Sequence, residues 1–362
     1  MKVFIKTYGC QANIADSEAM AGLLQKQGHD IVDNEKDAEK IIINSCSVKN
    51  KTQAKEMHYA RKWSEEKEVF VGGCLTKTID VKKFAPNVIA VFDTNSLTKV
   101  AEVLEKKKDI FSETKELSRL DIPVMRVKKT IGIIPISQGC LNTCTYCATK
   151  HSRGNLVSYR IGDIKRAVEQ AVKDGCTKIY LTSQDTGCYG FDMQTTLPEL
   201  LQELIDIEGD FIIRVGMMNP WHLKKILPEL LSVYHSEKIM KFLHIPLQSG
   251  SDTMLKHMKR IHTIQEFRTI VHSFRKEFPQ GHIATDIIVG YPLETQEDFK
   301  QTCSIIQEFH PEVLNISKFS SRKNTAAATL KQLSSEIIDE RSKELNRIYN
   351  EIKKEFLTVT LH

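Results

Sequence analysis

Residues 139–147 read GCLNTCTYC and directly follow a β-branched, apolar run at residues 131–137. Cys140, Cys144 and Cys147 therefore form a C-x3-C-x2-C motif at the carboxyl end of an expected strand. Three thiolates in one tight loop can hold three irons of a 4Fe–4S cluster and leave the fourth iron open. The alternatives are a zinc knuckle, with His151 as the fourth ligand, and chance spacing.

Five more apolar runs follow the first, and helical patterns separate them. Strands are expected at residues 131–137, 178–182, 211–215, 242–246, 283–289 and 313–318. Helices are expected at 164–173, 197–207, 223–234, 264–278 and 297–309, and a long charge-balanced helix is expected at 334–356. This alternation predicts an α/β fold, and six cycles are too few for a closed eight-fold barrel. We therefore expect a partial (β/α)6 barrel at residues 130–362 that binds ligands at the carboxyl ends of its strands.

The amino-terminal residues 1–110 show the same kind of alternation. Strands are expected at 2–8, 40–44, 69–72 and 88–92, with helices at 17–27, 52–66 and 97–107. Such βαβ units predict a separate parallel-sheet domain. Residues 111–129 are charged and weakly periodic, and we interpret them as the linker between the two domains.

Three further cysteines end strands of the amino-terminal domain. Cys10, Cys46 and Cys74 each come just after an expected strand. Each one taken singly is best explained as a buried apolar residue. The strands of a parallel sheet end on one edge, however, so the three thiols can converge. A second cluster with an open iron is the sharper interpretation.

Charge and hydropathy limit the class of protein. The 362 residues carry 51 Lys and Arg against 46 Asp and Glu, and the net charge of +5 permits a polyanionic partner without requiring one. No apolar run reaches the length of a membrane-spanning helix, and the first residues lack the order of a signal peptide. We therefore expect a cytoplasmic protein without membrane contact. Nine cysteines in a reducing compartment favour metal or redox chemistry over disulfides.

Over nearly its whole length, the sequence resembles the radical S-adenosylmethionine (SAM) methylthiotransferases. The segments GCQANIADSE (9–18), NSCSVK (44–49) and VGGCL (71–75) are similar to the three cysteine segments of that family, and the C-x3-C-x2-C loop is similar to its barrel motif. Four loops look most like the archaeal and eukaryotic branch, which methylthiolates N6-threonylcarbamoyladenosine beside the tRNA anticodon. They are LTSQDTGCYG (181–190), RVGMMNP (214–220), HIPLQSGSDTMLKHMKR (244–260) and TDIIVGYPLETQEDF (285–299).

The resemblance implies two 4Fe–4S clusters, SAM, a tRNA anticodon loop and an electron donor, with a methylthio group added at C2 of the adenine. A radical is needed because protein acids and bases cannot usefully deprotonate that carbon. The first alternative is a methylthiotransferase for another tRNA adenosine derivative or for a ribosomal-protein side chain. The others are an enzyme whose second cluster only relays electrons, and a non-enzymatic RNA-binding protein.

Several supporting residues follow from the resemblance. Tyr146 is expected along the adenine of SAM, although loop packing would also explain it. The SAM ammonium is expected at the end of the second barrel strand, at Ser183, Gln184 and Asp185. Arg214 is expected to bind the SAM carboxylate, with an ordinary ion pair as the alternative. Gln248 and Asp286 are expected in the pocket, and Asp286 could equally be structural.

Basic residues near the expected strand ends are candidates for RNA binding, although charge runs are usually solvated faces. The substrate candidates are Arg153, Arg160, Lys259, Arg260 and Arg322. A cation should bind the carboxylate of the threonylcarbamoyl arm, with Arg153 or Arg322 as candidates. Further basic residues lie at Lys49, Lys51, Lys55, Arg61, Lys62, His151 and Lys256.

The sequence departs from the family pattern in three places. Leu293 stands where the family usually has Gly, and Lys323-Asn324 replace a Pro-Gly pair. The chain stops at His362, where relatives continue into a small RNA-binding barrel, the TRAM domain. Two explanations are open: a truncation after the tail helix, or a protein that borrows RNA affinity from a separate TRAM-type protein. The ending LTVTLH (357–362) alternates like a short strand, which favours the second explanation and a strand that pairs with such a partner.

Overall fold

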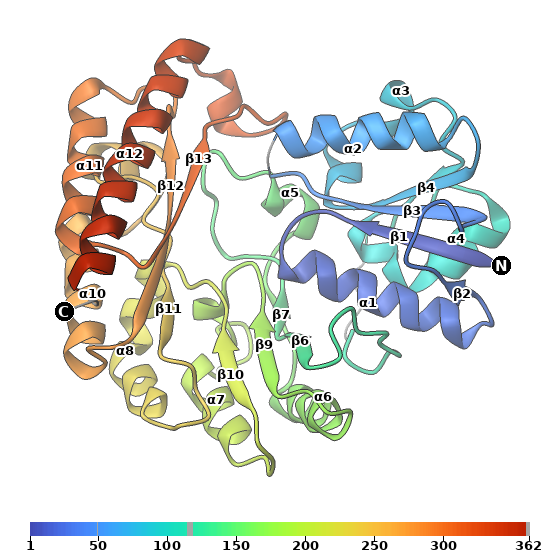
Figure 1. The fold of residues 1–362 in the computed structure, drawn as a ribbon, viewed down its shortest axis with the longest axis horizontal. Helices are drawn as coiled ribbons and strands as arrows, with labels where there is room; N and C mark the ends of the chain where they lie inside the picture. Colours follow the sequence, from blue (N-terminus) through green and yellow to red (C-terminus); the bar gives the residue numbers. More distant parts are fainter. Residues whose placement is uncertain (49, 114–118, 360–362) are drawn as a thin grey trace.

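The computed structural model describes residues 1–48, 50–113 and 119–359. A parallel sheet with helices on both faces lies beside a curved array of βα units (Figure 1). This arrangement confirms the predicted α/β fold with an amino-terminal parallel sheet and a partial barrel. No helix in the described part of the chain is both long and apolar enough to cross a membrane.

Five parallel strands form the amino-terminal sheet in the order β2-β1-β3-β4-β5. They are β1 (Lys2–Thr7), β2 (Asp30–Ile31), β3 (Lys40–Ser45), β4 (Glu68–Gly73) and β5 (Ala90–Val91). Helix α1 (Gln11–Lys26) and helix α2 (Asn50–Trp63) cover opposite faces (Figure 1). Side chains alternate along β3, so Ile42 packs in the α1 core while Ile41 and Ile43 pack in the α2 core. The sequence did not predict β2, which has two residues and no periodicity to detect.

The barrel consists of two three-stranded parallel sheets, β6-β9-β10 and β11-β12-β13. A single parallel bridge joins Ile213 of one sheet to Ile239, which lies just before the first strand of the other sheet. The strands are β6 (Ile131–Pro135), β9 (Lys178–Thr182), β10 (Ile212–Val215), β11 (Phe242–His244), β12 (His282–Val289) and β13 (Val313–Lys318). The outer helices are α6 (Ile161–Lys173), α7 (Leu197–Ile205), α8 (Pro220–Tyr234), α10 (Ile264–Glu277), α11 (Gln296–Phe309) and α12 (Ser335–Val359).

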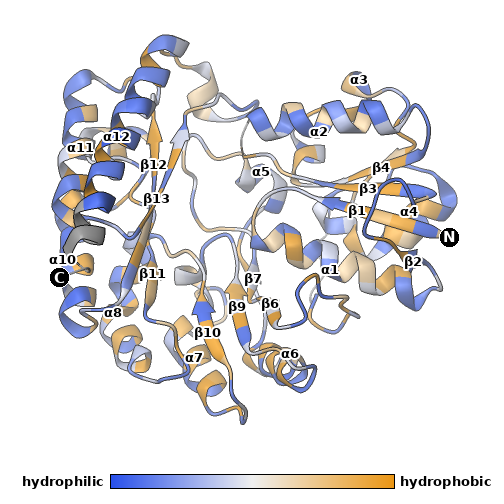
Figure 2. Cartoon of the chain, viewed as in Figure 1, coloured by the Kyte–Doolittle hydropathy of each residue, from blue (hydrophilic) through white to orange (hydrophobic). Residues whose placement is uncertain are grey.

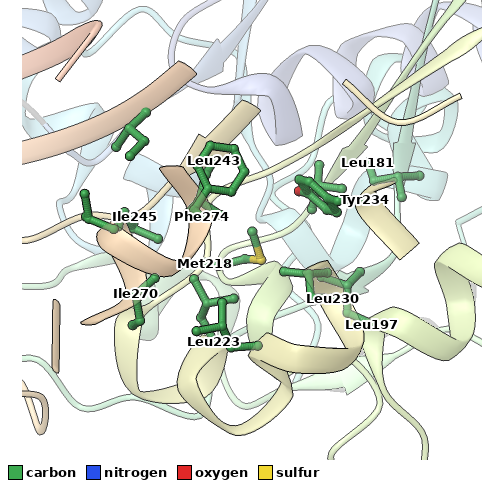
Figure 3. Packing of buried hydrophobic residues seen from close by; sticks show 14 of the residues in the cluster. Leu181, Leu197, Met218, Leu223, Leu230, Tyr234, Leu243, Ile245, Ile270 and Phe274 are labelled. Carbon is green, nitrogen blue, oxygen red and sulfur yellow. The ribbon is translucent and has the colours of Figure 1, made fainter. Parts of the chain in front are cut away.

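Apolar side chains from the strands meet the inner faces of these helices. Figure 2 shows the apolar colour concentrated on the strands and alternating with polar residues on the helices. In the core close-up, Leu181 of β9 and Leu243 of β11 lie near Tyr234 of α8 and Phe274 of α10 (Figure 3). This one continuous core fixes the strand ends where the cysteine loop begins.

The carboxyl-terminal helix corrects one prediction. Helix α12 continues to Val359, so the expected strand at 357–362 is wrong for residues 357–359. A long helix already provides the hydrogen bonds for its last turn, and this outweighs the weak β-propensity of a few residues. Residues 360–362 lie outside the described residues, as does Lys49.

The segment between sheet and barrel lies along α1. Its described residues, 111–113 and 119–129, contain neither helix nor strand. Arg119 donates to Asp16 of α1 at 2.8 Å, and the backbone of Met125 donates to the Glu18 carbonyl at 2.9 Å. The Pro123 carbonyl lies so close to Gly22 that a side chain at position 22 would clash with it. The expected linker is therefore packed against the amino-terminal domain.

Glu18 makes this contact dependent on pH. Its side chain is 2% exposed, and Oε1 accepts a hydrogen bond from the Val127 N–H at 2.9 Å. Burial raises the pKa of Glu18 from 4.5 to about 7. The folded state therefore binds the proton more tightly than the unfolded state, and stability falls as the pH rises between these two values. The full effect is about 3 kcal/mol.

We therefore expect Glu18→Gln to gain thermal stability relative to the wild type as the pH is raised from about 5 to about 8. Thermal unfolding followed by circular dichroism at several pH values measures the difference. The exposed Glu65→Gln is the matched control and should follow the wild type. Parallel pH curves for Glu18→Gln and the wild type would contradict the buried-acid explanation.

Candidate active site

The C-x3-C-x2-C loop lies at the carboxyl end of β6, after the short strand β7 (Ser137–Gln138). A turn joins Cys147 N–H to the Cys144 carbonyl at 3.1 Å and folds the loop back on itself. Burial, together with the nearby charges of Asp185, Cys147 and Cys144, raises the pKa of Cys140 to about 12. The three thiols are thus near one another and can share one cationic centre.

Asp185, which follows β9, is hydrogen-bonded to this loop through Asn142. It is fully buried, and Asn142 Nδ2 donates both to Asp185 Oδ2 at 3.0 Å and to Cys140 Sγ at 3.1 Å. His222 Nδ1 lies 2.7 Å from the same carboxylate, and Asn219 Nδ2 donates to it at 2.6 Å. Burial raises the pKa of Asp185, but the hydrogen bond and charge of His222 and the two hydrogen bonds from Asn219 together outweigh it and leave the pKa below its usual value. Asp185 therefore orients the loop through Asn142.

The other residues expected at SAM surround the same loop. Gln184 Oε1 accepts the Gly139 N–H at 2.5 Å, which ties the end of β9 to the loop. Ser183 Oγ accepts the Asp185 N–H at 3.0 Å. Tyr146 packs against a small apolar cluster that contains Met254, Met258, Tyr291 and Phe319.

Farther along the barrel, polar residues lie on adjacent strands. The Arg214 guanidinium of β10 lies 4.3 Å from the Phe242 ring centroid and 5.3 Å from that of Tyr180. Asp286 of β12 lies 2.9 Å from His244 Nε2, and the Gln248 N–H donates to the Asp286 carbonyl at 2.7 Å. His222 and His244 carry no local signal in the sequence, because only the fold brings them to Asp185 and Asp286.

Cys10, Cys46 and Cys74 come together at one sheet edge. They follow β1, β3 and β4, which are adjacent strands. Asn13 Oδ1 lies 3.9 Å from Cys10 Sγ and 3.7 Å from Cys74 Sγ. A Cβ on Gly9 would lie 3.1 Å from Cys46 Sγ, so Gly9 lets Cys46 approach the loop that carries Cys10. Three converging thiols form a donor set that fits an iron–sulfur cluster with one open position.

Helix α5 (Thr149–Arg153) joins the two cysteine sets. It begins two residues after Cys147, and Ser152 Oγ donates to the Cys74 carbonyl at 2.7 Å. Arg153 Nε donates to Cys74 Sγ at 3.3 Å, while Nη2 donates to Asp16 at 2.6 Å. One short helix thereby fixes the distance between the two loops.

Two of the RNA-contact candidates are buried in this structure. Arg153 is 3% exposed and pairs with Asp16, so it acts inside the protein. Arg260 is 5% exposed, donates to Asn219 Oδ1 at 2.6 Å and lies 4.5 Å from the Trp221 ring centroid. Neither guanidinium can reach phosphate in this arrangement. Arg160 and Lys259 are exposed, and Arg322 is buried at the junction of barrel and sheet domain.

Two family models match different parts of the chain. Uncharacterized protein family UPF0004 matches residues 2–92, and the radical SAM superfamily matches residues 134–306. A probable threonylcarbamoyladenosine tRNA methylthiotransferase from Pyrococcus horikoshii is 41% identical, over 98% of this chain and 85% of its own. The chain belongs to the threonylcarbamoyladenosine tRNA methylthiotransferase family. The Homo sapiens threonylcarbamoyladenosine tRNA methylthiotransferase is 36% identical, over 96% of this chain and 62% of its own.

Solved structures show the same fold. The radical SAM methyltransferase TsrM from Kitasatospora setae, solved with cobalamin and a 4Fe–4S cluster, superposes with a TM-score of 0.66. The match covers 90% of this chain and 74% of that one at 11% identity, so the similarity concerns the fold. As a member of its family, the chain is a radical SAM enzyme with SAM and iron–sulfur cofactors.

Two of the three departures from the family pattern replace a Gly, but the backbone there keeps the conformation that Gly favours. Leu293 has φ 81° and Asn324 has φ 67°, both in the left-handed region. Asn tolerates this conformation well, whereas Leu is strained in it. The family preference for Gly at these two positions is therefore explained by the backbone conformation that this chain also adopts.

Proposed function

We propose that this enzyme adds a methylthio group to C2 of N6-threonylcarbamoyladenosine in the tRNA anticodon loop, forming ms2t6A with two 4Fe–4S clusters. The observation that carries the proposal is the pair of cysteine triads, one at strand ends of each domain, joined through α5. A reaction that brings one substrate atom to two reactive centres needs such fixed spacing. The names of the relatives support the tRNA substrate.

In this proposal, Cys140, Cys144 and Cys147 hold one cluster and Cys10, Cys46 and Cys74 hold the other. When bound, the clusters supply the one-electron and sulfur chemistry that side chains lack. Asn142 and Asp185 orient the first loop, and Arg153 orients Cys74. The groups around SAM would be Tyr146, Ser183, Gln184, Arg214, Gln248 and Asp286.

The protein also shapes the binding of RNA. Exposed Arg160 and Lys259 are proposed to contact phosphates, which contribute most of the salt-dependent affinity. The substrate base must leave its stack to present C2, as is common for enzymes that modify bases. The electron donor and the free-standing TRAM-type partner stay predictions.

Reconstituted enzyme tests the substrate directly. Anaerobic incubation with SAM, sulfide and reductant is followed by mass spectrometry of three samples: tRNA with the threonylcarbamoyl group, tRNA without it, and ribosomal protein. We expect the methylthio product from the first sample. Equal product from both tRNAs, or product from ribosomal protein instead, would contradict the proposed substrate.

A further inference from the structure

Arg322, in the loop after β13, has hydrogen-bonding groups that the protein leaves unused. It is 7% exposed, and its Nη1 donates to Gln53 Oε1 of α2 at 2.8 Å. Within the described residues, Nε and Nη2 have no hydrogen-bond partner. These two N–H groups point from the same edge of the guanidinium, in the parallel arrangement that matches the two oxygens of a carboxylate.

A carboxyl oxygen on α2 is also unused. Glu56 of α2 is fully buried, and its Oε1 accepts the Cys46 N–H at 2.9 Å. Its Oε2 has no partner in the part of the chain that the structure describes. Gln53, which accepts from Arg322, and Glu56 lie one turn apart on the same face of α2, so the two unused groups are close to each other. No ion pair joins Arg322 and Glu56 among the described residues, so both keep unsatisfied hydrogen-bonding atoms.

Two more unpartnered oxygens accompany this pair. The Ser47 hydroxyl follows Cys46 directly, and the Tyr8 hydroxyl is electrostatically coupled to Glu56; neither has a described partner. Buried polar groups in native proteins are nearly always hydrogen-bonded to protein, water or ligand. Four such residues beside one cysteine of the sheet edge indicate a site for a small polar group.

We propose that Arg322 binds the carboxylate of the threonylcarbamoyl arm, while Glu56 Oε2 forms a hydrogen bond with a polar group of that arm. This inference rests on the proposed function. The arm has the groups that the unused atoms require: a carboxylate for the two guanidinium donors, and N–H, O–H and carbonyl groups that can pair with the Glu56 carboxyl. Arg153, the other candidate cation, is excluded because Asp16, Asn13 and Cys74 already engage it.

The position of Arg322 explains how the arm selects the base. Arg322 belongs to the barrel, whereas Gln53 and Glu56 belong to the sheet domain. An arm held between them lies beside Cys46 and at the junction of the two domains. A base without the arm would leave these buried polar groups unpaired, which disfavours it strongly.

Binding of anticodon stem-loops to the reconstituted holoenzyme tests the assignment. Three RNAs are compared by anaerobic fluorescence anisotropy: one with adenosine, one with the threonylcarbamoyl group, and one with its carboxylate blocked as a methyl ester. We expect the wild type to bind the free carboxylate about 10- to 100-fold more tightly than the ester, the range for a charge-assisted hydrogen bond. Arg322→Gln should bind the free-carboxylate RNA and the methyl-ester RNA equally, each with the affinity that the wild type shows for the ester.

Two matched variants support the comparison. Gln53→Leu removes the acceptor that holds the guanidinium and should reduce the preference for the free carboxylate. Arg160→Gln removes an exposed cation and should weaken all three RNAs alike. Iron content and the visible spectrum of Arg322→Gln should equal those of the wild type.

The outcomes separate this inference from the proposed function. An Arg322→Gln enzyme that keeps the full preference, or that loses affinity for all three RNAs equally, overturns the assignment of Arg322. If Arg322→Gln gives either of these results and the wild type still forms the methylthio product, only the assignment of Arg322 fails. If the wild type forms no product on any RNA, the proposed function itself fails, whatever the binding shows.

Discussion

Replacing Cys140, Cys144 and Cys147 together with Ala is expected to abolish SAM cleavage completely. The variant should also retain about four of the about eight irons per reconstituted chain, because only one donor set is lost. Iron analysis and chromatographic detection of 5′-deoxyadenosine measure the two effects.

The matched control is Cys176→Ala with Cys303→Ala. These two buried cysteines lie outside both triads and should leave iron content and SAM cleavage unchanged. A variant of the first triad that still cleaves SAM would show that the radical chemistry is located elsewhere.

Replacing Cys10, Cys46 and Cys74 with Ala is expected to give the opposite combination. Methylthiolation of tRNA should disappear and about four irons should remain, while SAM cleavage is retained. The separation is expected because these thiols belong to the sheet domain, and the SAM-binding candidates belong to the barrel. Full iron content in this variant would remove the basis for a second cluster.

The sequence predicted the features that depend on local patterns. The alternation of apolar runs located all six barrel strands within a few residues. The rule that parallel strands end on one edge predicted that Cys10, Cys46 and Cys74 would converge. Their distances to Asn13 and Gly9 agree with that expectation.

Long-range partners could not be predicted in the same way. Arg153 looks like a surface cation in sequence, because its partner Asp16 lies 137 residues away. Arg260 is similar: its partners Asn219 and Trp221 are brought close only by the barrel. Basic residues near strand ends therefore divide into buried positioning residues and exposed ones, and only the fold assigns each residue to its class.

Short and irregular elements were also missed for a physical reason. Strand β2 has two residues, too few for any hydropathy period, and it forms only because β1 offers a free edge. The left-handed residues Leu293 and Asn324 carry no local signal of their own, since neither is Gly. Only the glycines that the family has at these two positions indicate the left-handed backbone.

One measurement tests the central claim most directly. A stem-loop RNA carries N6-threonylcarbamoyladenosine with deuterium at C2 of the adenine, and reconstituted enzyme is incubated with it, SAM, sulfide and reductant. Mass spectrometry of the nucleosides should find a product that has gained one methylthio group and lost the deuterium. A methylthiolated nucleoside that keeps its deuterium, or no methylthiolated nucleoside at all, would contradict the account.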